Sequence, residues 1–267
     1  MKKFENKVIC CDVDGTLVDD DFFLPEENLK AIEYFRSEGG IFTIATGRTI
    51  QGLKRYKEFL NLTHPFVCQN GGALYDYKKD EFIWCEPLGT DAADVVNFIH
   101  EKYPEIGIEV ITTAGAYCIY ENQGTRKHEM DEHFKFIQSD LKSLKGDWLK
   151  VVFAGSEEET DAVQATLEKS DYYNKFQMVR SFYSYYEFVN KNTNKARAVQ
   201  ELSKVLGIGI EKFVVIGDNQ NDCSMLSLPC KSFTPSSAAD IAKSCADVVL
   251  KSSNNDGVLK EVLEYIK

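Results

Sequence analysis

The sequence predicts an α/β fold with a doubly wound, mostly parallel core sheet and an inserted α+β domain. Short apolar runs such as residues 8–11 and 213–216 have the composition of strands covered on both faces, as in parallel sheets. Segments with helical spacing of apolar residues alternate with these runs, which is typical of right-handed parallel crossovers. Between residues 86 and 187 this alternation is replaced by a mixture of paired strands and helices, which indicates a second, smaller domain.

The length and composition are those of an ordinary globular protein. The chain has 267 residues, of which 43% are hydrophobic, enough for one large domain or two of ordinary size. Its formal net charge of -11 argues against a general basic surface that would bind nucleic acid or anionic membranes. We therefore expect neither a nucleic-acid nor a membrane partner.

Two further features predict a cytoplasmic protein. Residues 1–6 are charged and lack the apolar region of a signal peptide, and no run approaches the roughly 18 apolar residues of a membrane span. The eight cysteines show no CxxC pair and no zinc-type spacing, so we interpret them as reduced thiols. Cys11 has no obvious histidine partner, which argues against a thiol nucleophile.

Two carboxylates follow the first predicted strand. Asp12 and Asp14 lie two residues apart, and Gly15 then allows a sharp turn. Carboxylates this close repel each other unless a cation or a proton intervenes, and Mg²⁺ is a usual solution because it prefers oxygen ligands. The alternative is that both residues only cap a turn before the next helix.

The next segments continue the doubly wound pattern. We expect a helix over residues 25–38, a buried strand over 41–45 and a second helical segment that extends to residue 60. Thr46 and Gly47 follow the 41–45 strand, where a hydroxyl and backbone N–H groups suit a phosphate oxygen, although Thr46 is equally suited to cap a helix. A third strand over 66–69 precedes Asn70, interpreted as a turn residue rather than a ligand contact, and a hairpin over 74–84 follows.

The inserted domain is predicted to span residues 86–187, and residues 1–85 and 188–267 are predicted to form the core. Its expected elements are a helix capped by Thr90, paired strands over 106–120, a long polar helix through about residue 144, and a strand–helix–strand–strand series to residue 189. The aromatic run at 182–186 is interpreted as packing surface, with a ligand platform as the alternative. The basic cluster at 126–128 is interpreted as a solvated helix face.

After residue 190 the core pattern resumes with a helix, and Lys195 lies in its first turn. A cation there conflicts with the positive end of the helix dipole, and a bound anion would remove the conflict. The buried strand 213–216 then leads to Asp218, Asn221 and Asp222, which repeats the arrangement of acidic residues at the first strand. Short strands over 229–233 and 246–250 and a helix over 257–266 complete the chain.

Four segments in this order resemble the haloacid dehalogenase-like superfamily of hydrolases. They are DVDGT at residues 12–16, ATGR at 45–48, Lys195, and GDNQND at 217–222. The size and position of the insertion resemble the Cof-like branch, which has a large α/β cap on a Rossmann-like core. The resemblance extends through residues 70–72 and 253–258, so it covers nearly the whole chain.

The resemblance implies a role for each matching residue. Asp12 would be the nucleophile that forms an aspartyl-phosphate, and Asp14 would protonate the leaving oxygen and then activate water. Thr46 and Lys195 would hold the phosphoryl oxygens, with Gly47 in the same loop and Asn221 as an additional contact.

The resemblance also implies a Mg²⁺ site and a mobile cap. The metal ligands would be Asp12, the main-chain carbonyl of Asp14, and Asp218, with Asp222 close enough to ligate or orient. The cap would close over the site and exclude bulk water. The expected function is a Mg²⁺-dependent phosphatase of small phosphorylated metabolites, either sugar phosphates or phosphorylated cofactors. The alternatives are a phosphosugar mutase and a non-catalytic phosphometabolite-binding protein.

The chain departs from the family pattern at two places. Residues 234–238 read TPSSA where the family often has Met-x-Asn-Ala, and Ala196 follows Lys195 where glycine is usual. Both departures concern loop details and substrate contacts.

Overall fold

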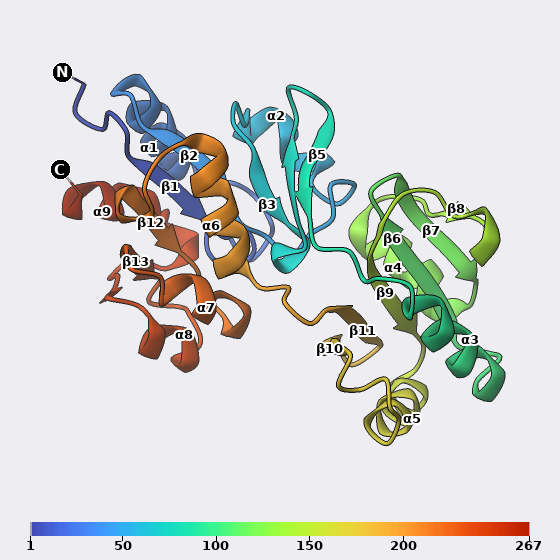
Figure 1. Ribbon diagram of the computed structural model, residues 1–267. Coiled ribbons are helices and arrows are strands. Elements are labelled where there is room, and N and C mark those ends of the chain that lie inside the picture. The colour runs from blue at the N-terminus through green and yellow to red at the C-terminus, as the bar shows by residue number, and fades with distance from the viewer. Residues whose placement is uncertain (1, 267) are drawn as a thin grey trace. The chain divides into compact units, whose positions relative to one another are not determined.

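A computed structural model describes residues 2–266 and divides the chain into two compact units (Figure 1). One unit contains the chain up to Trp84 and from Asn194 onward, and the other is Cys85–Thr193. The second unit extends beyond the expected end at residue 187 because all of strand β11 (Tyr185–Asn190) pairs within its sheet.

A five-stranded sheet forms the centre of the first unit, and all of its strand pairs are parallel. In spatial order its strands are β14 (Val248–Val249), β13 (Lys231–Thr234), β12 (Phe213–Ile216), β1 (Val8–Cys11) and β2 (Ile41–Ile44). Strand β1 lies between β12 and β2, and its residues are all buried, which explains why its sequence is a continuous apolar run.

Helices cover both faces of this sheet. Val8 and Cys10 face a cluster formed with α6 (Lys195–Leu206), α7 (Cys223–Leu226) and α8 (Asp240–Cys245). On the other side α1 (Glu26–Ser37) and α9 (Val258–Tyr265) pack together, and α1 contacts β2 (Figure 1). The doubly wound prediction is therefore confirmed, although the short helices α7 and α8 had no expected counterpart in the sequence.

The hairpin expected over residues 74–84 forms within a second, three-stranded sheet, which also contains the strand expected over 66–69. Its strands are β3 (Phe66–Cys68), β4 (Ala73–Asp76) and β5 (Glu81–Cys85). The 66–69 segment was predicted as a third strand without a stated direction. Strand β3 pairs antiparallel with β4, and an isolated bridge between Ala45 and Val67 joins it to the parallel sheet. The tight turn over residues 69–72 reverses the chain and makes the antiparallel neighbour the nearest strand.

The helical segment expected up to residue 60 is shorter than predicted. Only the 3₁₀ turn η1 (Lys54–Tyr56) and the single helical turn α2 (Lys57–Leu60) form. Asn61 then adopts a left-handed conformation with φ 39°, which ends the helix. The preceding residues form turns that carry Thr49 and Leu53 into the core.

The second unit is built on a six-stranded mixed sheet in the order β10-β11-β9-β6-β7-β8. The strands other than β11 are β6 (Gly107–Thr112), β7 (Gly115–Tyr120), β8 (Ile137–Gln138), β9 (Trp148–Ala154) and β10 (Phe176–Phe182). Its helices are α3 (Ala92–Lys102), α4 (Gln123–Glu132) and α5 (Glu157–Glu168). Side chains of α3 and α5 pack on one sheet face, around Ile108, Val110 and Phe153.

The long polar helix expected through about residue 144 is wrong. Helix α4 ends at Glu132 because His133 adopts a left-handed conformation with φ 58°. Phe136 is then buried with Ile111 and Cys118, and β8 adds to the edge of the sheet beside β7. The polar composition that suggested a helix belongs to a loop and an edge strand. Within residues 2–266, no helix combines the length and the apolar character that a bilayer crossing requires.

Candidate active site

Three parallel strands bring the acidic loops and Thr46 to one edge of the sheet. In the strand register Cys11 lies opposite both Ile216 and Ile44, so all three strands end at the same level. The next residues along the chain are Asp12, the Gly217–Asp218 segment and the Ala45–Thr46 segment. The apolar strands are short and in register, and their carboxyl ends therefore place these side chains together, as in other open α/β sheets.

Three carboxylates gather at this edge. One oxygen atom from each of Asp12, Asp218 and Asp222 can be chosen so that all lie within 4.8 Å of one another. Asp12 is 5% exposed and Asp222 is fully buried. Acidic groups packed this closely out of water require compensating positive charge.

Lys195 supplies part of that charge from the first turn of α6. Its side chain is fully buried, and its Nζ donates to Asp12 Oδ1 at 2.8 Å and to Asp222 Oδ1 at 2.6 Å. The two carboxylates raise the pKa of Lys195, against the opposing effect of burial, so the ammonium group stays charged. The conflict between a cation and the helix N-terminus is resolved here by protein carboxylates.

The side chain of Asp222 stabilises the conformation of the second acidic loop. Its Oδ2 accepts hydrogen bonds from the backbone N–H groups of Asp218 at 2.9 Å and Asn219 at 3.1 Å, while its Oδ1 accepts from Lys195. Both oxygens are therefore already bonded to the protein. This arrangement favours an orienting role for Asp222 over direct ligation of a metal.

The remaining acidic side chains fit a hard divalent cation. Burial and the charge of Asp222 raise the pKa of Asp12 well above its usual range, although Lys195 acts in the opposite direction. The same two causes raise the pKa of Asp218 to about 6, and the Thr16 hydroxyl, which donates to Asp218 Oδ1 at 2.8 Å, partly opposes them. Three carboxyl groups thus face the single ammonium group of Lys195, and a divalent ion with oxygen ligands would stabilise their ionised forms.

Asp14 does not join this carboxylate group. Its two oxygens accept from Arg48, with Nε to Oδ2 at 2.8 Å and Nη2 to Oδ1 at 2.8 Å, in a two-pronged ion pair. Such a pair fixes both the position and the orientation of a carboxylate. The sequence had predicted Asp14 as a functional residue, but it had not identified Arg48 as its partner.

Thr46 and Asn221 lie on either side of Asn70. The Thr46 hydroxyl accepts from the Arg48 N–H at 3.1 Å and keeps its own proton for another acceptor. Asn70 donates its backbone N–H to the Thr46 carbonyl at 3.0 Å, and Asn70 Oδ1 accepts from Asn221 Nδ2 at 3.0 Å. A Cβ at Gly47 would lie only 2.9 Å from the same Asn70 oxygen. Asn70 is therefore both a left-handed turn residue, with φ 55°, and the link between these loops.

Sequence reasoning identified neither the partner roles of Arg48 and Asn70 nor the contact from Thr16 to Asp218. All three residues belong to motifs that were recognised. Their position within those motifs was the signal that could have indicated a role at the site. Cys11 is buried, and burial raises the pKa of its thiol well above the usual range. This agrees with the expectation that Cys11 is not a nucleophile.

Replacing Gly15 by alanine is expected to weaken the binding of a divalent cation by about ten-fold or more. This is the usual effect of losing a residue that orients a metal ligand. Gly15 has φ 72°, and a Cβ there would lie 2.4 Å from Asp218 Oδ2, so the methyl group must displace that carboxylate. Calorimetric titration with Mg²⁺ measures the effect. Gly207→Ala is the matched control, because Gly207 has φ 66° but open space around a Cβ. Equal Mg²⁺ affinities for the two variants would contradict the prediction.

A comparison with protein families identifies one that spans this chain. A family model described as haloacid dehalogenase-like hydrolase matches residues 9–262, which include both acidic loops, Thr46 and Lys195.

Similar proteins match along almost the full length. The 5-amino-6-(5-phospho-D-ribitylamino)uracil phosphatase YcsE of Bacillus subtilis is 25% identical, over 97% of this chain and 96% of its own. The phosphoglycolate phosphatase of Thermoplasma volcanium is 25% identical over 91% of both chains. The crystal structure of TM0651 from Thermotoga maritima superimposes with a TM-score of 0.86 at 24% identity, over 98% of this chain and 97% of that one.

Proposed function

The chain belongs to the haloacid dehalogenase-like hydrolase family, and from this premise we propose that it is a Mg²⁺-dependent phosphatase of small phosphorylated metabolites. Its enzyme class is phosphoric monoester hydrolase, the activity that its named relatives share. We further propose that the metal is Mg²⁺ and that the substrates are sugar phosphates or phosphorylated cofactors. The observation that carries it is the meeting of Asp12, Asp218 and Lys195 at the end of the parallel sheet.

In the proposed reaction Asp12 attacks the phosphorus atom, and the bond from phosphorus to the leaving oxygen breaks. The product is an aspartyl-phosphate, and a water molecule then hydrolyses it. The Lys195 ammonium, 2.8 Å from Asp12 Oδ1, orients the attacking carboxylate and places positive charge where the phosphoryl oxygens gain negative charge. The Thr46 hydroxyl and the amide of Asn221 would bind the other phosphoryl oxygens.

Asp14 would act as the general acid and base. It would give a proton to the leaving oxygen and later accept one from the attacking water. Its ion pair with Arg48 holds the carboxylate in one orientation.

Asp12, Asp218 and the main-chain carbonyl of Asp14 would hold the Mg²⁺ ion, and Asp222 would orient the loop that contains Asp218. The ion would supply charge that stabilises the transferring phosphoryl group. Coordination would also relieve the repulsion that raises the pKa values of Asp12 and Asp218.

The substrate class rests on the named relatives. One acts on a phosphorylated ribitylaminouracil and another on phosphoglycolate, and both are small phosphomonoesters. We assign part of the substrate selection to the inserted residues 86–187, because Asp12, Thr46 and Lys195 bind only the phosphoryl group in this proposal. The net charge of -11 makes a nucleic-acid substrate unfavourable.

Removal of Mg²⁺ is expected to abolish phosphate release. The purified protein would be offered a panel of sugar phosphates and phosphorylated cofactors, with Mg²⁺ or with excess EDTA, and released phosphate would be measured. We expect at least a hundred-fold difference between the two conditions, because the metal contributes several kcal/mol to stabilising the charge that develops. Activity that is unchanged in EDTA would contradict the metal assignment.

The same panel separates the alternatives. An isomerised phosphosugar without free phosphate would indicate a mutase. Binding of panel compounds without turnover would indicate a non-catalytic binding protein.

A further inference from the structure

An exposed aromatic side chain in a strained conformation lies beside the Asp14–Arg48 pair. Phe22 is 46% exposed and has φ 63°, in the left-handed region that bulky residues rarely adopt. Strain of this kind persists only where the surroundings enforce it, and it gathers at sites that bind or react.

Specific hydrogen bonds enforce this conformation. The Phe22 N–H donates to the Asp19 carbonyl at 3.0 Å, and the Phe23 N–H donates to Asp19 Oδ1 at 2.8 Å. Arg55, from the η1 turn, donates its Nη2 to the Phe22 carbonyl at 3.2 Å. These three hydrogen bonds fix the backbone at Phe22, although its ring lies at the surface, where an aromatic side chain gains little from burial.

Two guanidinium groups share this ring. The Cζ atoms of Arg48 and Arg55 lie 5.6 and 5.4 Å from the centroid of the Phe22 ring. They also lie 5.5 and 4.8 Å from the centroid of the Tyr56 ring. The two rings thus keep the Arg55 guanidinium close to that of Arg48, and Arg48 is bonded directly to Asp14.

The two cations differ in how their charge is compensated. Arg48 is paired with Asp14, whereas no carboxylate oxygen of residues 2–266 lies within 4.0 Å of an Arg55 nitrogen. This is unusual in a chain with eleven more acidic than basic residues, as its charge of -11 shows. A partly buried guanidinium that stacks on aromatic rings is well placed to bind a carboxylate or a phosphate through two hydrogen bonds.

We propose that Arg55 and Phe22 form a subsite for a second anionic group on the leaving-group side of the substrate. This inference rests on the proposed function, in which Asp14 protonates the leaving oxygen, so the leaving group must lie beside Asp14 and its partner Arg48. A substituent on that group then reaches the stack of Arg48, Phe22 and Arg55. The preferred substrates are phosphomonoesters whose leaving group carries a carboxylate or a second phosphate.

The competing explanation is that Arg55 only holds the Phe22 loop. In that case loss of Arg55 would affect all substrates alike. Substrate pairs that differ only in the second anionic group distinguish the two explanations. Suitable pairs are 3-phosphoglycerate with glycerol 3-phosphate, which tests a carboxylate, and fructose 1,6-bisphosphate with fructose 6-phosphate, which tests a phosphate.

The test measures kcat/KM for both pairs with the full-length protein in Mg²⁺. Arg55→Gln is expected to lower kcat/KM for the anionic member of at least one pair by about 10-fold to 100-fold, the usual effect of losing a hydrogen-bonded charge pair. For the member without the second anionic group, kcat/KM should change less than about two-fold. Arg55→Lys keeps the charge but loses the planar fork, and it should retain part of the preference.

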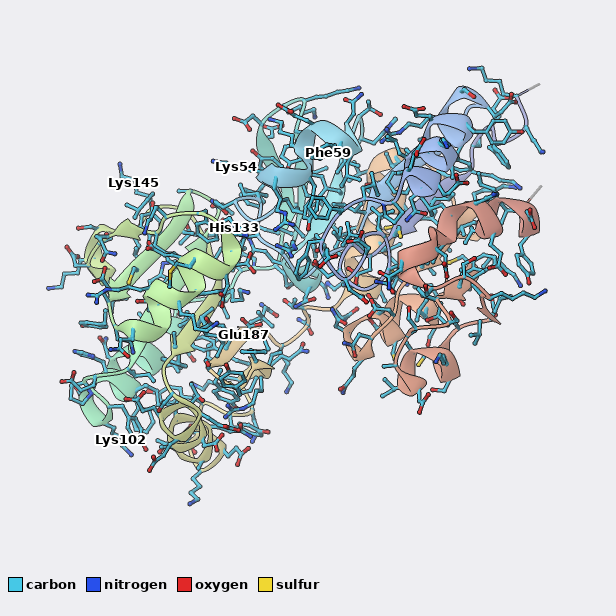
Figure 2. The ribbon with its side chains drawn as sticks, turned by 180° about the vertical axis from the view of Figure 1, so that it is seen from behind. Lys54, Phe59, Lys102, His133, Lys145 and Glu187 are labelled. Carbon is cyan, nitrogen blue, oxygen red and sulfur yellow. The ribbon has the colours of Figure 1, made fainter. Side chains whose placement is uncertain are left out.

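Lys54→Gln is the matched control. Lys54 is exposed in the same η1 turn (Figure 2). Its replacement by glutamine removes the same charge, so this variant reports any general electrostatic effect. The preference of the wild-type protein should survive in this variant. Thermal unfolding of each variant verifies that the fold is retained.

Three results would overturn the inference. They are no preference for either anionic substrate in the wild-type protein, an equal loss on both members of each pair in Arg55→Gln, and the same loss of preference in Lys54→Gln. In each case hydrolysis of other phosphomonoesters would leave the proposed function intact. Failure of the wild-type protein to hydrolyse any phosphomonoester would overturn both.

Discussion

Asp12→Asn is expected to reduce phosphate release by about a thousand-fold or more, since the variant keeps the shape of the side chain but lacks the nucleophilic oxygen. Its fold should not suffer. Burial and Asp222 raise the pKa of Asp12, which means that the ionised carboxylate is unfavourable in the metal-free protein. A neutral amide removes that repulsion and can still accept the hydrogen bond from Lys195.

Steady-state phosphate release and thermal unfolding in EDTA measure the two parts of this prediction. We expect activity to fall while the unfolding temperature without metal stays equal or rises. Asp171→Asn, an exposed residue of the second unit, is the control for the same chemical change. Wild-type activity in Asp12→Asn would exclude the proposed nucleophile. Inactivity together with a collapsed fold would show instead that Asp12 is a structural residue.

Lys195→Met should destabilise the protein as well as inactivate it. Lys195 is fully buried and bonds both Asp12 and Asp222, so its removal leaves two buried carboxylates without their cation. Breaking a buried ion pair in this way typically costs about 3–5 kcal/mol. The free energy of unfolding, measured by urea denaturation in EDTA, should fall by an amount of this order.

Added Mg²⁺ should restore part of that lost stability, because it would replace positive charge at the same carboxylates. It should not restore activity, since the phosphoryl oxygens would still lack the ammonium group. Lys204→Met is the matched control, because Lys204 lies on the same helix but is exposed and pairs with the surface residue Glu201. A Lys195→Met protein as stable as this control would show that the buried ion pair contributes little.

The main elements of the fold could be predicted because their signals are local. Apolar runs such as Val8–Cys11 identified the parallel strands, and Asn194 and Gly207 mark the observed ends of α6. The prediction failed where tertiary contacts override local composition. Residues 133–144 are polar enough for a helix, but burial of Phe136 and pairing of β8 with β7 make them a loop and an edge strand.

The candidate site could be predicted in part, because each motif places its own residues next to a strand end. Asp12, Thr46 and Asp218 were identified in this way, and Lys195 was identified by its position in the first turn of a helix. Their partners could not be inferred, since a hydrogen bond between distant segments leaves no periodic signal. The bond from Thr16 to Asp218 and the link from Asn70 to Asn221 are examples.

The sequence by itself determined the chemistry that this protein has available: two acidic loops after buried strands, a hydroxyl, and a lysine at a helix start. Only the tertiary structure decided which of these groups lie together and which are paired elsewhere. It separated Asp14, paired with Arg48, from the carboxylates around Lys195. It also left Arg55 stacked on aromatic rings, with no acidic partner among residues 2–266. The physical reason is that the state of a charged group depends on burial and on neighbours within a few ångströms, and folding rather than sequence distance sets both.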